Sequence, residues 1–236
     1  MDNRIFEARS IAIAACAVVL AACGTTEQAK VSQADVKCAF LGSACAQLVP
    51  GTEGQAALRY INPAAKWTQY KKIMIQPVTF FGDDTSKVSV EDQQRLVNFL
   101  YGALNEELAK QFEIADQDGP DVMKLQVALT DVAAATPGLR SITMVVPQAR
   151  LLSTVKRGAT GSYPFVGGAQ AEFKLTDSTT GEILAAALDR RMGGGSIETA
   201  AQWQWGDAEN AMKEWAKLAA ERLSGWTKGT AKAQAN

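Results

Sequence analysis

The sequence predicts an α/β fold of the α+β kind: a two-layer sandwich with two long amphipathic helices on one face of a mixed or mostly antiparallel sheet. Three observations predict it. Several short segments alternate apolar and polar residues, as strands with one buried face do. Two of them are joined by a tight turn, which makes part of the sheet antiparallel. Two longer segments repeat apolar residues every three or four positions, as one-face-buried helices do.

The first strand and the first helix follow each other closely. Residues 72–80 are mostly apolar and predict a strand, in which Pro77 must lie on an edge or near the end because it cannot donate to a sheet ladder. Ser89 with Asp92 resembles a capping box and predicts a helix that runs to about Gln111. The apolar residues expected on its buried face are Leu96, Phe99, Leu100, Ala103, Leu104 and Leu108.

The remaining strands come after this helix. A short strand at 112–114 is followed by the clearest alternating segment, 123–130. Residues 169–176 alternate in the same way, and the turn 177–182 leads into a partner strand at 182–190.

An amphipathic helix over 207–223 closes the predicted domain. Its buried face is expected to hold Ala208, Ala211, Met212, Trp215, Leu218 and Ala219. The stretch 136–168 fits no single pattern, although 148–156 is compatible with a short helix.

The N-terminus has the layout of a secretory signal. A short start carrying Arg4 and Arg9 precedes an uncharged run, 11–22, that ends in two alanines. Because a cysteine follows these small residues directly, the segment resembles the lipobox of bacterial lipoproteins. The resemblance implies cleavage between Ala22 and Cys23 and acylation of Cys23 as the first residue of the mature chain.

The position of the anchor follows from the same segment. The apolar run is shorter than the roughly 20 residues of a membrane-spanning helix, which leaves an ordinary cleaved signal as the main alternative. Several acyl chains supply more than the two signals that stable membrane attachment requires. Aspartate after the cysteine retains such proteins at the inner membrane of enteric-type bacteria, and here Gly24 takes that place. We therefore expect the protein on the periplasmic face of the outer membrane.

Composition divides the chain into four parts. Residues 1–22 form the signal, and 23–58, rich in small and polar residues, is expected to be a tether. Residues 59–227 form one globular α/β domain, and the small-residue and lysine tail 228–236 is expected to be disordered.

Cys38 and Cys45 remain once the signal is removed and Cys23 is acylated. An even pair in an oxidising compartment favours one disulfide within the tether. Metal binding by two cysteines alone and redox chemistry of the CxxC type are disfavoured, the latter because the spacing is wrong.

Charge and composition restrict the function. The net charge is −1, and the signal removes equal numbers of acidic and basic residues. A near-neutral chain without basic clusters argues against nucleic-acid binding. The sequence contains no histidine, which excludes histidine-activated nucleophiles and the usual histidine-based metal sites. No cofactor or metal site is expected.

Short polar motifs have plain structural interpretations. The turn 177–182 combines acidic and hydroxyl side chains with Gly181, which suits a positive φ. Gly193–Gly195 lacks the strand and lysine context of a phosphate loop and is expected to be a joint. The loop carboxylates Asp116, Asp118 and Asp121 do not match calcium-loop spacing.

Aromatic residues are the remaining candidates for an interaction site. Trp203 and Trp205 flank one residue, so we expect them not to enter one core together and at least one to be exposed. Together with Tyr70 they are candidates for a protein or glycan contact. The alternative is that they lie under the N-terminal segment, which would cover the last helix.

A family resemblance covers nearly the whole chain. It rests on short motifs in a fairly specific order: 60–63, 67–70, 78–81, 129–131, 167–169, 177–182 and 215–216. Together with the lipobox they resemble a bacterial lipoprotein family named only as domain of unknown function 3313. The family has no established activity, so the resemblance implies a localisation in the cell envelope but no particular reaction or ligand.

The expected function is therefore that of an accessory or binding lipoprotein of the cell envelope, without catalytic activity. Its expected contacts are the membrane, through the acyl chains, and an envelope protein partner. The alternative is an envelope hydrolase that acts on peptidoglycan through carboxylates.

Overall fold

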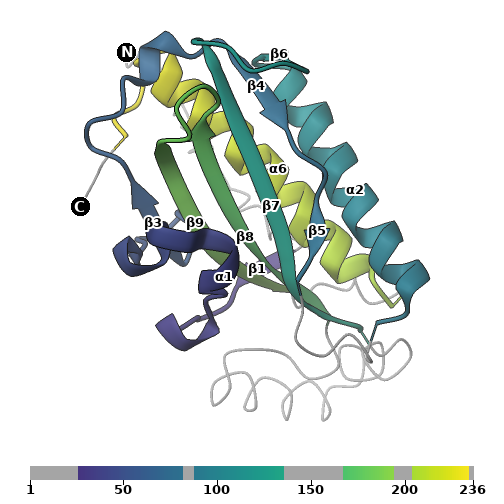
Figure 1. Ribbon diagram of the computed structural model, residues 1–236. Helices are drawn as coiled ribbons and strands as arrows, with labels where there is room; N and C mark the ends of the chain where they lie inside the picture. Colours follow the sequence, from purple (N-terminus) through teal and green to yellow (C-terminus); the bar gives the residue numbers. More distant parts are fainter. Residues whose placement is uncertain (1–25, 82–87, 136–166, 194–203, 234–236) are drawn as a thin grey trace, which may run out of the picture.

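The computed structural model describes residues 26–81, 88–135, 167–193 and 204–233. They form a nine-stranded mixed sheet with two long helices packed side by side on one face (Figure 1). This confirms the predicted α/β class, the mixed sheet and the pair of helices on one face.

The elements agree with most of the expected segments. The strands are β1 (Thr26–Gln28), β2 (Val49–Pro50), β3 (Leu58–Ile61), β4 (Lys72–Ile75), β5 (Thr79–Phe80), β6 (Glu113–Ile114), β7 (Val122–Ala133), β8 (Gly168–Asp177) and β9 (Ile183–Gly193). The helices are α1 (Cys38–Leu41), α2 (Val90–Ala109) and α6 (Gly206–Thr227), with 3₁₀ turns η1 (Gln33–Asp35), η2 (Gly42–Gln47) and η3 (Trp67–Gln69). The short helix expected at 148–156 lies outside the described residues.

The sheet is antiparallel on one side and parallel on the other. Its order is β2-β3-β9-β8-β7-β4-β6. The long strands β7, β8 and β9 run antiparallel, whereas β4 and β5 both pair with β7 in parallel. On its outer edge β9 pairs with β3 along 185–188 and with β1 along 191–193.

The segment 72–80 forms two short strands instead of the single strand predicted. Pro77 lies between β4 and β5, where it has no N–H to donate to β7. The neighbouring Gln76 still donates its backbone N–H to the Leu125 carbonyl, at 2.9 Å. The chain therefore keeps its place beside β7 but loses strand geometry at the proline.

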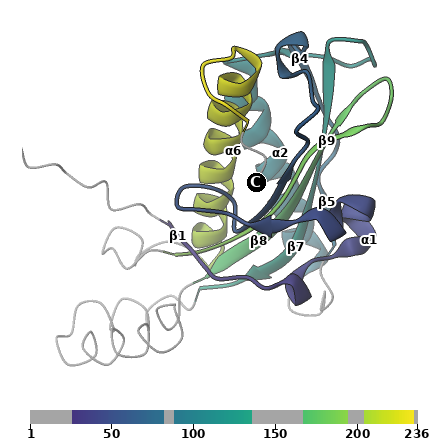
Figure 2. The same ribbon diagram turned by 90° about the vertical axis from the view of Figure 1, so that its left-hand side faces the viewer.

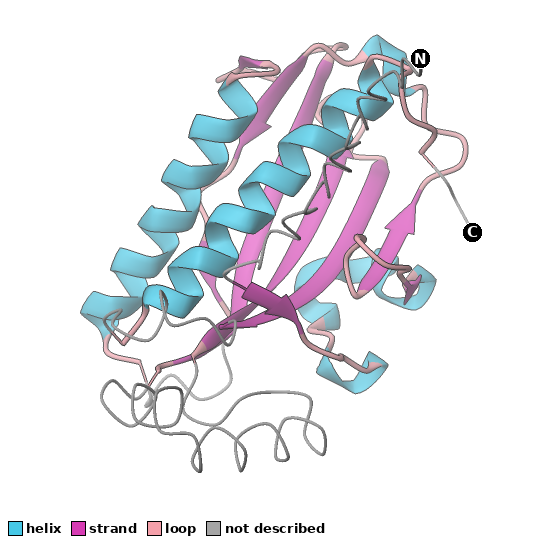
Figure 3. Cartoon of the chain, turned by 180° about the vertical axis from the view of Figure 1, so that it is seen from behind, coloured by secondary structure: helices cyan, strands magenta, loops and turns pink. Residues whose placement is uncertain are grey.

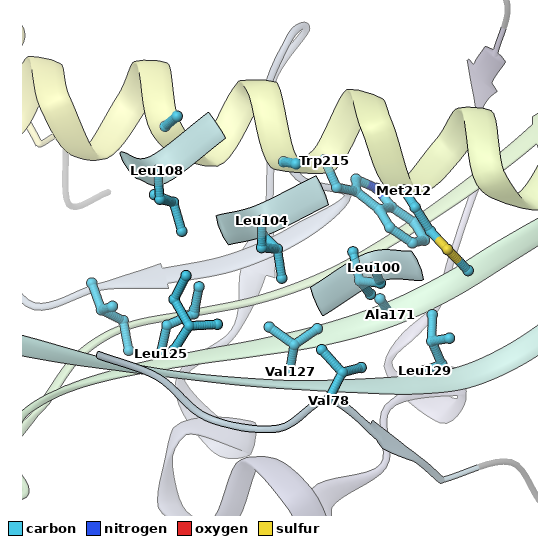
Figure 4. Close-up of a cluster of buried hydrophobic side chains, with 14 of the residues drawn as sticks. Val78, Leu100, Leu104, Leu108, Leu125, Val127, Leu129, Ala171, Met212 and Trp215 are labelled. Carbon is cyan, nitrogen blue, oxygen red and sulfur yellow. The ribbon is translucent and has the colours of Figure 1, made fainter. Parts of the chain in front are cut away.

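Both long helices form where predicted and bury their apolar faces. The Ser89 hydroxyl accepts the backbone N–H of Asp92 at 3.1 Å, which caps the start of α2. In Figure 4 the leucines of α2 and the Trp215 and Met212 side chains of α6 point onto β7 and β8. These side chains belong to the main core cluster, whose fully buried members include Leu96, Leu100, Leu104, Leu108, Met123, Leu129 and Met212.

The segment expected to be a tether belongs to the folded domain. Residues 26–57 are called here the N-terminal segment. Its strands β1 and β2 join the sheet, and its part between them, which holds η1, α1 and η2, crosses the face opposite the two helices (Figure 2). The segment buries a second apolar cluster of Val36, Leu41, Ala44, Cys45, Leu48, Leu58, Ala186 and Leu188. The expectation was wrong because the segment's overall composition is polar and small, while its few aliphatic residues are enough to bury it against a sheet face.

The chain after α6 is also partly placed. Lys228 donates to the Gln111 side chain at 2.9 Å, and Ala233 packs against the main core. The disorder expected for 228–236 therefore does not describe its first six residues. No helix in the described part of the chain is long and apolar enough to cross a membrane.

Candidate functional site

The structure describes only some of the residues expected to carry function. Ala22, Cys23 and Trp203 lie outside the described residues, so acylation stays a prediction. Cys38 and Cys45 form the expected disulfide, with their Cα atoms 5.2 Å apart. The bond closes a small loop within the N-terminal segment, beside the second apolar cluster.

Tyr70 and Trp205 do not form a surface, which corrects their assignment as a contact site. Each is only 3% exposed and belongs to the main core cluster. The Tyr70 hydroxyl donates to the Asp177 carboxylate at 2.9 Å. Burial and this hydrogen bond raise the pKa of Tyr70 to about 12. The two side chains are buried because the segments that carry them pack under the helices, which residue spacing alone does not show.

The polar turn motifs have structural roles. Asp177 accepts the backbone N–H groups of Thr179 and Thr180, at 3.0 and 2.8 Å, and Gly181 has φ +72°. The expected hairpin turn is therefore present. Burial alone would raise the pKa of Asp177, but these hydrogen bonds and that of Tyr70 lower it. Gly193 lies so close to Asp207 that a Cβ would be 2.3 Å from its Oδ1 atom, a carboxylate position that disfavours a phosphate.

A cleft of about 230 Å³ lies between strands β3 and β9 of the sheet and the C-terminal half of α6. Figure 3 shows the helix-covered face, where the strands that line the cleft, β9 and β3, continue the sheet beside α6 on the side away from α2. We call this hollow the α6 cleft. Its lining includes Arg59, Phe173, Ala185, Ala187, Asp189, Trp215, Leu218, Ala219, Arg222 and Trp226.

Small residues keep the α6 cleft open. Ala185 and Ala187 point to the helix face of β9, where larger side chains would fill the space. Across the cleft, α6 presents Leu218 and Ala219, which are only partly buried. Phe173 and Trp215 form the inner wall as an edge-to-face pair, with ring centroids 5.8 Å apart. The cleft is thus apolar at its base although its lining still reaches solvent.

Asp189 occupies one end of the α6 cleft and joins four parts of the chain. Its carboxylate accepts hydrogen bonds from Trp215 Nε1 at 2.8 Å, the Ala57 backbone at 3.0 Å, Arg191 Nε at 3.1 Å and Gln28 Nε2 at 2.5 Å. It is 2% exposed. These four hydrogen bonds connect β1, the residue before β3, β9 itself and α6. The charge of the buried carboxylate is compensated by Arg191.

Two more guanidinium groups line the same end. Arg59 is 7% exposed on β3, and Arg222 is partly buried on α6. Burial lowers the pKa of Arg222; Asp189 opposes this, while the charges of Arg191 and Arg59 lower it further. Three guanidinium groups, those of Arg59, Arg191 and Arg222, therefore lie near Asp189, and Glu221 is a second carboxylate close to Arg222.

A second buried polar group lies on the opposite face of the sheet. Glu172 on β8 is 0% exposed and accepts the Lys37 backbone N–H. Its Oε2 atom has no hydrogen-bond partner in the structure. Burial raises the pKa of Glu172 to about 7, against the lowering effect of the Lys37 hydrogen bond. A raised pKa often marks a functional carboxylate, but here the N-terminal segment covers it.

Neighbouring polar side chains continue this buried layer. Gln170 donates to Thr130 Oγ1 at 3.0 Å and to the Asp35 carbonyl at 3.2 Å. Lys174 donates to the Phe40 carbonyl at 2.9 Å. The bonds to the Asp35 and Phe40 carbonyls fasten the N-terminal segment to the sheet.

The sequence reasoning did not select Arg59, Glu172, Asp189 or Arg222. A signal existed for Asp189, because a carboxylate directly after the apolar stretch 183–188 is unusual for a strand buried on both faces. Nothing in the spacing of Arg59 and Arg222 shows that they meet. Among the described residues no group of three or more acidic or cysteine side chains could hold a metal ion, and Asp118 instead pairs with Lys124 at 2.7 Å.

The fold and the cleft define an α/β sandwich with a small open site beside its last helix. The family model described as "Protein of unknown function (DUF3313)" matches residues 39–219, most of the chain. The chain therefore belongs to this family, as the sequence motifs predicted. No curated protein is significantly similar to it.

Several solved structures resemble the chain distantly. They include the PelC dodecamer from Paraburkholderia phytofirmans (11% identity, TM-score 0.37, 68% of this chain and 95% of that one). Another is a protein from Xanthomonas campestris (13%, 0.39, 73% and 95%). A third is a DUF4136 family protein from Bacteroides thetaiotaomicron (10%, 0.37, 72% and 95%). These scores are too low to carry an argument about function.

Proposed function

We propose that this protein is a lipid-anchored accessory protein of the bacterial cell envelope that binds a ligand or partner and catalyses no reaction. The observation that carries the proposal is the N-terminal signal, in which small residues directly precede Cys23. A lipid anchor holds the folded domain at a membrane surface. The absence of histidine from the sequence supports binding over histidine-dependent catalysis.

The anchor is tested by metabolic labelling of cells that express the full chain with radioactive palmitate. The wild-type protein is expected to incorporate label, and the Cys23→Ala variant is not. Globomycin, which blocks lipoprotein signal processing, is expected to cause the precursor to accumulate. An unlabelled wild-type chain that retains residues 1–22 would refute the proposal.

The place of the anchor is tested by membrane fractionation. We propose the periplasmic face of the outer membrane because Gly24 follows the acylated cysteine. The wild-type protein is expected in the outer-membrane fraction, and Gly24→Asp is expected to move it to the inner membrane. Equal distribution of the two proteins would contradict this sorting.

The binding role is tested by cross-linking in intact cells, followed by identification of the captured envelope protein. A chain that captures none would count against an accessory role. Incubation of the purified protein with peptidoglycan sacculi tests the catalytic alternative. If fragments are released, and their release stops when carboxylates are changed to amides, the protein is a hydrolase and the proposed binding role is wrong.

A further inference from the structure

We infer that the α6 cleft binds a single-chain amphipathic anion of the fatty-acid class, with the carboxylate at Arg59 and Arg222 and the alkyl chain along the apolar base. The inference names the ligand of the binding role proposed above and rests on that role. It starts from two properties of one hollow, its apolar base and its cationic end.

The base of the cleft suits an alkyl chain. Ala185 and Ala187 form a floor of small side chains, and Phe173, Leu218 and Trp226 stand around it. All five are partly exposed, although they belong to the apolar layer between sheet and helix. Covering such side chains with a chain of methylene groups gains about 25 cal/mol for each Å² of apolar surface removed from water.

The size of the cleft limits the ligand. A volume of about 230 Å³ has room for about eight groups of water or methylene size, taking ~30 Å³ for each. This fits one medium-length alkyl chain and excludes a two-chain phospholipid from full burial. A longer single chain can enter only in part.

The charge at the end of the cleft sets the headgroup. Asp189 already accepts four hydrogen bonds and pairs with Arg191, so its charge is compensated within the protein. Arg222 makes no hydrogen bond or ion pair among the described residues and points into the cleft beside Arg59. Guanidinium groups bind carboxylates through paired N–H donors, so a monoanionic headgroup complements this end.

The test uses the acylated full chain in phosphatidylcholine vesicles and a photoreactive derivative of decanoate. We expect cross-links in peptides that contain residues 185–187 and 215–226. Unlabelled decanoate is expected to compete, whereas decanol and decylamine compete about tenfold less well because they lack the anion. Labelling spread over the whole surface, or equal competition by decylamine, would overturn the inference.

Matched variants locate the site. Arg222→Gln is expected to weaken decanoate labelling about tenfold, while Lys217→Gln, which removes a charge from the exposed face of the same helix, leaves it unchanged. Ala187→Phe fills the floor and is expected to abolish labelling; circular dichroism shows whether this variant folds. If it does not fold, Arg222→Gln still decides, since wild-type labelling in that variant would refute the site.

The outcome of the decanoate experiment can be distinguished from the outcome of the tests of the anchor. An unacylated Cys23 would refute the proposed function whatever decanoate does. An acylated chain that binds no decanoate would keep the proposed function and refute only the ligand class.

Discussion

The two faces of the sheet are buried by different means. On one face, α2 and α6 cover β7 and β8 with large apolar side chains, and the core there is continuous. On the other face, the N-terminal segment covers β8 and β9 with a small apolar cluster and a layer of buried polar groups, among them Gln170 and Glu172. The first face is held mainly by apolar area, whereas the second also contains several hydrogen bonds, one disulfide and the buried carboxyl group of Glu172.

The difference teaches where the molecule can change without unfolding. Apolar packing between long helices and a sheet is lost cooperatively, because each side chain contacts many others. A short segment attached by a few polar bonds can detach locally at a lower free energy. We therefore expect the N-terminal segment to be less stable than the rest of the fold, although it leads to the proposed anchor at Cys23.

The largest expected effect is on the helix face. Leu104 is 0% exposed on α2, so Leu104→Ala is expected to lower the free energy of unfolding by about 2–5 kcal/mol through lost burial and a cavity. Denaturant titration followed by far-UV circular dichroism measures the loss. The exposed residue Tyr101 on the same helix gives a control, as Tyr101→Ala should change stability little. A loss below about 1 kcal/mol at Leu104 would contradict the continuous core.

The next effect is on the opposite face and is expected to be local. Cys38→Ser removes the disulfide, and opening its short loop is expected to cost about 2–3 kcal/mol in the loop-entropy model. Limited proteolysis followed by mass spectrometry is expected to show faster cleavage within residues 26–57. Reducing agent should reproduce this in the wild-type chain. If cleavage instead spreads at once through β7 and β8, the two faces unfold together and the comparison fails.

A pH effect of similar or smaller size is expected from Glu172. Its pKa is about 7 when folded, against 4.5 for an unperturbed glutamate, so folding takes up a proton between these values. The contribution of Glu172 to the free energy of unfolding is therefore largest below about pH 4.5 and is lost as the pH rises through about 7. The shift corresponds to at most about 3 kcal/mol.

The measurement is the free energy of unfolding at pH 5 and pH 8. The wild-type protein is expected to be less stable at pH 8 through Glu172, and Glu172→Gln is expected to flatten this difference, because glutamine does not titrate. Glu106→Gln, a change at an exposed glutamate on α2, serves as the control and should leave the difference unchanged. An identical pH dependence in the wild-type and Glu172→Gln proteins would show that the carboxyl group is not held in the buried layer.

The smallest effect concerns one hydrogen bond on the helix face. Tyr70→Phe keeps the ring in the core but removes the donor to Asp177, which retains the bonds from the turn. We expect a loss of about 1 kcal/mol, seen as a small shift of the denaturation midpoint. Phenolic titration offers a second measurement. The wild-type protein should contain one tyrosine that titrates near pH 12, and this titration should be missing from Tyr70→Phe. A loss as large as that of Leu104→Ala would mean that this bond supports more than the turn.

Long periodic elements were predictable from the sequence because their burial pattern repeats. The apolar spacing of α2 and α6 and the alternation of β7 and β8 each contain several independent matches to one geometry. The turn at 177–182 was predictable because Asp and Gly satisfy local backbone needs. The sequence predicted that Pro77 lies on an edge or near the end of one strand. In the structure it separates two strands, β4 and β5.

The covered second face and the α6 cleft were not predictable in this way. The N-terminal segment has no strong periodicity and only a few large apolar side chains, among them Leu41 and Leu48, so its burial depends on the sheet that it meets. The aromatic residues proposed for a surface, Tyr70 and Trp205, entered the core for the same reason, since exposure depends on the segments packed around a side chain.

The sequence by itself determined the family, the two long helices and the alternating strands, because each depends on residues that are neighbours along the chain. The secretory signal expected from residues 1–23 stays a prediction of the same kind. Only the tertiary structure decided that Arg59, Asp189 and Arg222 share one end of a cleft and that Glu172 lies under the N-terminal segment. These groups are far apart in the sequence. The charges of Arg59, Asp189 and Arg222 act on one another only after the sheet and α6 bring these residues to one cleft.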